Sequence, residues 1–146
     1  MKISKTEWKR MYREAVVHWD DIINFIIKHY DKVYNAYNLT AIAKGIEYEV
    51  NYRGEACSYC KKFSYDFCGG CPIAVAADET GCYGTPWHDF AISETSEDLL
   101  KLGLEERKFI IDTVPKQIKG YKLPKSILRK IEATNKKADE LREKYK

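Results

Sequence analysis

Four of the five cysteines lie in one short run, CSYCKKFSYDFCGGCP, at residues 57–72. They form two Cys-x-x-Cys pairs, and the fifth cysteine follows soon after them. Two thiolates at this spacing can turn toward one ion, and two such pairs can complete a tetrahedral site. The pattern therefore predicts a metal centre that uses four of the five thiols. The candidate ligands are Cys57, Cys60, Cys68, Cys71 and Cys82.

The spacing of the cysteines does not identify the metal. Zinc suits four thiolates, although the gap between the pairs is shorter than the roughly 12–20 residues of common zinc fingers and ribbons. Cys71-Pro72 is similar to the Cys-Pro that ends bacterial ferredoxin ligand runs, so a [4Fe–4S] cluster is the alternative. His88 could replace one thiol, and thiol redox chemistry at Cys68-Gly-Gly-Cys71 is a third interpretation. We take zinc as the leading hypothesis.

Composition bounds the setting of this site. The 146 residues are 45% hydrophobic and 32% charged, which is typical of one globular domain. The first 21 residues carry charge throughout, and no stretch approaches the roughly 18 apolar residues of a membrane span. We therefore expect no membrane partner and a reducing cytoplasm, where clustered cysteines favour metal ligation over disulfides.

Hydrophobic periodicity predicts the elements that position the cysteines. Apolar residues recur at steps of three and four over 4–37, which predicts one long amphipathic helix, with a capping box at Ser4-x-x-Glu7. Alternation in GIEYEVNYRG predicts a short strand that leads into the cysteine run. Pro72 favours a brief helix after Cys71, and Ser96 is a candidate cap for a further helix.

These elements predict a mainly α fold with a single domain, 1–146. The long N-terminal helix over 4–37 would pack with two C-terminal helices over 96–145. A cysteine-metal module with a short β segment, over 46–90, would be inserted between them. The wide apolar arc of the first helix could also form the seam of a homodimer.

Charge along the chain suggests a partner surface. Residues 116–146 hold 11 Lys/Arg and 4 Asp/Glu, while residues 78–112 are acidic. The basic segment could contact phosphates, or it could be a solvated helix face that its own acidic residues balance. The partner, protein or nucleic acid, stays open at this point. The candidate nucleic-acid contacts are Lys122, Lys125, Arg129, Lys130 and Lys137.

The chain contains no Walker A loop, no GxGxxG and no GxSxG, so we lean against an enzyme. The run CxxC…CxxCPI…GCYGTPW, over about residues 57–87, resembles small cysteine-rich proteins of phages and other mobile elements. The resemblance implies a mobile-element context, and a host cytoplasm if the source is viral, but no activity. We expect a non-catalytic, zinc-stabilised binding or regulatory protein, and an iron–sulfur protein with a redox or sensing role is the alternative.

Overall fold

The computed structural model describes residues 2–45, 57–63, 71–77 and 84–146. Its elements within these ranges are helical, which confirms the mainly α class. The predicted strand at 46–52 lies outside the described residues. The elements are α1 (Lys5–Lys28), α2 (Ala36–Gly45), α3 (Ser58–Phe63), α4 (Pro72–Ala77), α5 (Pro86–Ala91), α6 (Ser96–Asp112), the 3-10 helix η3 (Lys116–Ile118) and α7 (Lys125–Lys144).

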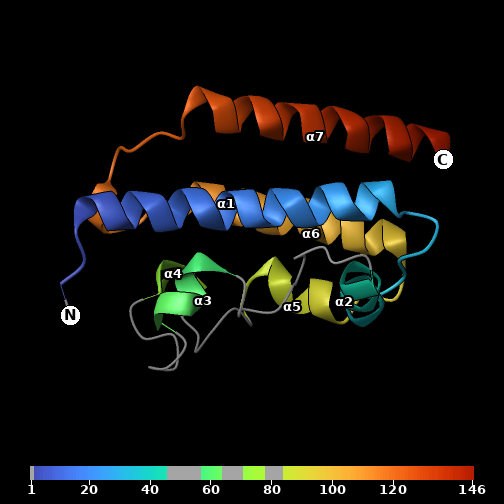
Figure 1. Cartoon of the computed structure of the whole chain (residues 1–146), viewed down its shortest axis with the longest axis horizontal. Coiled ribbons are helices and arrows are strands. Elements are labelled where there is room, and N and C mark those ends of the chain that lie inside the picture. Colours follow the sequence, from blue (N-terminus) through green and yellow to red (C-terminus); the bar gives the residue numbers. More distant parts are fainter. Residues whose placement is uncertain (1, 46–56, 64–70, 78–83) are drawn as a thin grey trace.

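Helix α1 is the centre of the molecule. It packs against α6, α7, α3 and η3, and Figure 1 shows α7 along one side of α1 with the short helices on the other. The wide apolar arc of α1 is therefore covered by elements of the same chain, and the homodimer seam stays an untested prediction. Fully buried core side chains include Met11, Ile22, Ile23, Leu99 and Leu100.

The single helix predicted over 4–37 is wrong, because α1 ends at Lys28. His29 leaves the helical region at φ −115° and ψ 31°, and α2 begins only at Ala36. The Asn35 side chain accepts a hydrogen bond from the Asn38 backbone at 2.7 Å. An asparagine that bonds the backbone in this way offers the chain a turn and a new helix start, in competition with continued helix.

The predicted starts of α1 and α6 agree with the structure, with small differences in their caps. Ser4 caps α1, accepting from the Glu7 backbone at 3.1 Å, while the Glu7 carboxylate pairs with Arg10 instead of completing the box. Thr95, and not Ser96, caps α6, and its hydroxyl accepts from the Asp98 backbone at 3.1 Å. Hydroxyl side chains in these positions satisfy backbone N–H groups that the first turn leaves free.

Gly103 allows α6 to approach α1 closely. A Cβ at this position would lie 3.3 Å from Ile23 Cγ1, tighter than ordinary van der Waals contact. The glycine weakens α6 as an isolated helix, but the packing against α1 requires a small residue there. The sequence pattern alone shows only the weakening.

A buried polar network ties α1, α6 and α7 together. Arg107 Nη1 donates to Asp20 Oδ1 at 2.7 Å, and both side chains are almost fully buried. Thr134 Oγ1 donates to Asp20 Oδ2 at 3.1 Å, and Asn24 Nδ2 donates to Thr134 at 2.8 Å. Arg107 Nη2 also donates to Asn135 Oδ1. Buried charges need such partners, so the network fixes the three helices in one register.

Within the described ranges, we find no helix that combines the length and the apolar character needed to cross a membrane.

Candidate functional site

The first Cys-x-x-Cys pair lies where α3 meets α1. Ser58 Oγ donates to the Met11 carbonyl at 2.5 Å, and the rings of Trp8 and Phe63 stack with centroids 5.7 Å apart. These contacts fix both ends of α3 against α1. They hold Cys57, which directly precedes the helix, and Cys60, which lies one turn along it.

Cys57 has the environment of a thiolate. A hydrogen bond from the Cys60 thiol lowers its pKa to about 7, burial opposes this, and the backbone N–H groups of Cys60 and Tyr59 lower it further. The Lys61 ammonium acts in the same direction. Thiolate is the form that binds metal, so this arrangement fits one half of a chelating site.

Cys71, the second cysteine of the other pair, stands directly before a short helix, as Cys57 does. Cys71 directly precedes α4, and its carbonyl accepts from the Val75 backbone at 3.0 Å, as the Cys57 carbonyl accepts from Lys61 at 3.0 Å. Burial raises the pKa of the Tyr59 hydroxyl, and the nearby thiols of Cys57 and Cys71 raise it further. Tyr59 is therefore a common neighbour of one cysteine from each pair.

Helix α5 is held close to these cysteines by a buried carboxyl on α6. Glu106 Oε2 accepts from the Trp87 backbone at 2.9 Å, and Glu106 is only 1% exposed. Burial raises its pKa to about 7, hydrogen bonds from Thr85 and Trp87 lower it, and Cys57 raises it. Glu106 thus caps the start of α5, the helix that carries His88.

The described residues contain only part of the predicted ligand set. Cys57, Cys60 and Cys71 are thiols that carry no disulfide, while Cys68 and Cys82 lie outside the described residues. Over the ranges described, no three His, Cys, Asp or Glu side chains come together as a metal site. His88 lies on α5, and its predicted role as a substitute ligand stays a prediction. The four-ligand site therefore remains a prediction, with a chelating half whose environment fits a metal.

A second candidate region is the basic end of the molecule, defined by residues 2–14 and 113–131, which include the first half of α1, η3 and the first turns of α7. Figure 1 shows these parts gathered at the N-terminal end of α1. Arg13 donates to the Tyr121 hydroxyl at 3.0 Å, and Lys9 Nζ lies 5.3 Å from the centroid of the Tyr121 ring. Tyr12 meets the same ring edge-on at 6.1 Å. Tyr121 therefore joins cations of α1 to the segment after η3.

The basic end carries many more positive than negative side chains. Residues 113–131 contain six Lys/Arg and no Asp/Glu. Residues 2–14 add five Lys/Arg and two Asp/Glu, Glu7 and Glu14, which both pair with Arg10. Cations that converge from separate segments, with little local acid, create a positive field that attracts phosphates.

The predicted contact residues fall on this surface unequally. Lys122, Lys125, Arg129, Lys130 and Lys137 are all exposed. Lys130 Nζ lies 3.9 Å from Asp21 Oδ1, so its charge is partly balanced. Lys137 lies further along α7, three turns beyond Lys125.

Sequence reasoning missed Lys9 and Arg13 as members of this surface. Their signal was present, since Lys5, Lys9 and Arg13 recur every four residues and therefore share a face of α1. Glu106 was also missed, because nothing in the apolar pattern of α6 separates a buried acid from an exposed one.

The comparisons with known proteins add no relative. No protein-family model matches the chain, and the searches of curated proteins and of solved structures found no match.

Proposed function

We propose that this chain is a non-catalytic, zinc-stabilised binding protein that contacts nucleic acid through its basic end. The observation that carries the proposal is the contact between α1 and the segment after η3, in which cationic side chains of α1 reach Tyr121. Arg13 and Lys9 reach Tyr121 from α1, while Lys122 and Lys125 follow it in the chain. A phosphate backbone is the partner that such a cluster of cations fits.

The cysteine module supports the zinc part of the proposal. Cys57 carries a thiol whose pKa is lowered to about 7, Cys60 is beside it, and Tyr59 links it to the neighbourhood of Cys71. Cys68 or Cys82, with His88 as a substitute, would complete the ligands. Zinc bound there would link the short helices α3 and α4, which have little core of their own, and would hold them against the rest of the molecule.

Titration of the full chain with labelled oligonucleotides over a range of salt tests the nucleic-acid part. Fluorescence anisotropy should give an association constant that falls steeply with salt, since binding releases condensed counterions. Lys122→Glu should weaken binding by about tenfold and reduce the salt slope by about one or two charges. The experiment uses both single-stranded and duplex probes, because a cluster of cations would recognise phosphates and not base sequence.

Lys101→Glu is the matched control. It makes the same charge change at an exposed position of α6, away from the basic end. It should leave affinity within about twofold of the wild type, because a distant exposed charge is screened by salt. Equal losses in the two variants, or binding that salt does not weaken, would contradict the proposal and leave a protein partner as the alternative.

An iron–sulfur protein is the second candidate. The specific observation that favours it is Cys71 followed by Pro72 as the first residue of α4, the position that ends ferredoxin ligand runs. A cluster would confer a redox or sensing role on the same thiols.

A further inference from the structure

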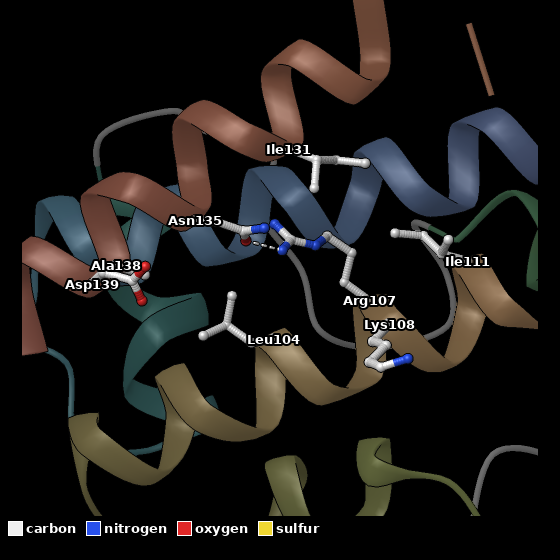
Figure 2. A pocket seen from close by; sticks show the side chains of 8 residues that line it. All are labelled: Leu104, Arg107, Lys108, Ile111, Ile131, Asn135, Ala138 and Asp139. Carbon is white, nitrogen blue, oxygen red and sulfur yellow. Dashed lines mark hydrogen bonds between the residues drawn. The ribbon is translucent and has the colours of Figure 1, made fainter. Parts of the chain in front are cut away.

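A pocket of about 400 Å³ lies between α6 and α7. Its volume falls in the range of small-molecule sites in proteins, about 300–1,000 Å³. Figure 2 shows α6 along one wall and α7 along the other, with the Arg107 side chain crossing between them. The side chains that line the pocket are labelled in Figure 2.

Most of the wall is hydrocarbon. Leu104 and Ile111 line the pocket from α6, one turn to either side of Arg107, and Ile131 and Ala138 line it from α7. Ile131 and Ala138 belong to the core. The pocket therefore offers apolar contact on both sides, as ligand sites commonly do.

The polar groups at the centre of the pocket are hydrogen-bond donors. Arg107 is 4% exposed, and its Nη1 and Nη2 are used by Asp20 and Asn135. Its Nε is buried and has no hydrogen-bond partner. The Asn135 oxygen already accepts from Arg107, so its amide nitrogen is left as a second donor. A buried donor without an acceptor is costly, and such a group needs an explanation.

Apart from the exposed Asp139 carboxylate on the rim, the side-chain acceptors around Arg107 are already engaged. Both oxygens of Asp20 are used, one by Arg107 and the other by Thr134 and Asn24. Lys108, on the rim, pairs with Asp112 at 2.6 Å. Arg107 Nε therefore has no hydrogen-bond acceptor beside it. A ligand that fits the pocket would supply this acceptor and would carry an apolar part that fills the space between Leu104 and Ile131.

The geometry points to a binding site for a small monocarboxylic acid with a hydrocarbon tail. Its carboxylate would accept from Asn135 Nδ2 and, after a shift of the Arg107 side chain that exposes its buried Nε, from Arg107 Nε. Its tail would lie between the apolar side chains of α6 and α7. Asp139 on the rim carries the same charge as the ligand and should therefore weaken binding. This site is separate from the basic end and does not depend on the proposed function.

The test uses the full chain, isotope-labelled, and sodium octanoate as the probe. The Arg107 Nε–H signal should shift in step with the methyl signals of Leu104 and Ile131 and should saturate with a Kd on the order of 1 mM. Octylammonium, which has the same tail and the opposite charge, should shift them far less. No saturable shift with octanoate, or an equal shift with octylammonium, would overturn the inference.

Three variants keep the test independent of folding. Leu104→Trp should fill the pocket and weaken octanoate binding by about tenfold, whereas Leu128→Trp, the same change at an exposed site of α7, should leave it unchanged. Asp139→Asn removes the opposing charge and should tighten binding by roughly threefold. An unchanged affinity in Leu104→Trp, or weaker binding in Asp139→Asn, would place octanoate elsewhere and overturn the assignment.

Discussion

The two parts of this molecule are stabilised in different ways. Helices α1, α6 and α7 are 24, 17 and 20 residues long and bury most of the core against one another. Helices α3, α4 and α5 are six residues each. Isolated helices shorter than about 12–15 residues are marginal in water, so the short ones depend on contacts from outside. The long helices can be stabilised by burial of apolar surface alone, whereas the proposed metal would add a second source of stability to the short helices.

Removal of metal should show this difference most strongly. Structural zinc in small peptides contributes about 10–16 kcal/mol of apparent binding free energy, which is folding free energy for the module. With chelator, amides of 58–63 and 72–77 should exchange rapidly with solvent, while those of α1 and α6 should stay protected. Hydrogen exchange followed by mass spectrometry measures both regions in one sample.

Cys57→Ser should reproduce the effect of chelator without any reagent. The hydroxyl keeps the size of the side chain but is a poor zinc ligand at neutral pH. Metal content and exchange at 58–63 that remain as in the wild type would remove Cys57 from the ligand set.

The buried ion pair of the long helices should give the next largest effect. Asp20→Ala leaves Arg107 buried without its carboxylate and should lower the free energy of unfolding by about 3–5 kcal/mol. Lys108→Ala breaks the exposed pair with Asp112 on the same helix and should cost only about 0.5 kcal/mol. Urea denaturation compares the two variants. Similar costs for both would mean that burial of the Asp20–Arg107 pair does not determine its contribution.

Glu106, where the two parts meet, should make stability depend on pH. Burial raises its pKa from the usual 4.5 to about 7. Between these values the unfolded chain ionises while the folded chain keeps its proton, so stability falls as pH rises, by about 3 kcal/mol in total. Above about pH 7 the loss is complete.

Glu106→Gln keeps an acceptor for the Trp87 backbone and cannot ionise. Its stability relative to the wild type should therefore increase from about pH 4.5 to about pH 7 and then level off. Denaturation at a series of pH values measures this, with Glu105→Gln at the neighbouring exposed position as the control. A constant difference between Glu106→Gln and wild type across that window would show that Glu106 ionises normally.

The long helices were predictable because their apolar spacing is dictated by packing. Candidate hydroxyl caps predicted the starts of α1 and α6 to within one residue. The two helices predicted over 96–145 are confirmed as α6 and α7. The break after Lys28 was not predictable from spacing, because apolar residues continue in step through the turn to Tyr37. The bond from the Asn38 backbone to the Asn35 side chain lies where helix begins again as α2, and the apolar spacing does not reveal it.

The sequence predicted some parts of the candidate sites and missed others. Cysteine spacing marked the module from residue types alone, since few other roles need two Cys-x-x-Cys pairs. The basic end was found only in its C-terminal part, because the meeting of Arg13 with Tyr121 depends on tertiary packing across 108 positions of chain. The pocket beside Arg107 has no sequence signature at all, since it arises from the distance between two helices.

Elemental analysis with an absorption spectrum, on freshly purified protein kept from oxygen, tests whether the cysteines hold zinc. We expect one zinc per chain and no visible absorbance, because zinc has a filled d shell. Iron with acid-labile sulfide and a broad visible band would contradict it and would assign the cysteines to an iron–sulfur cluster.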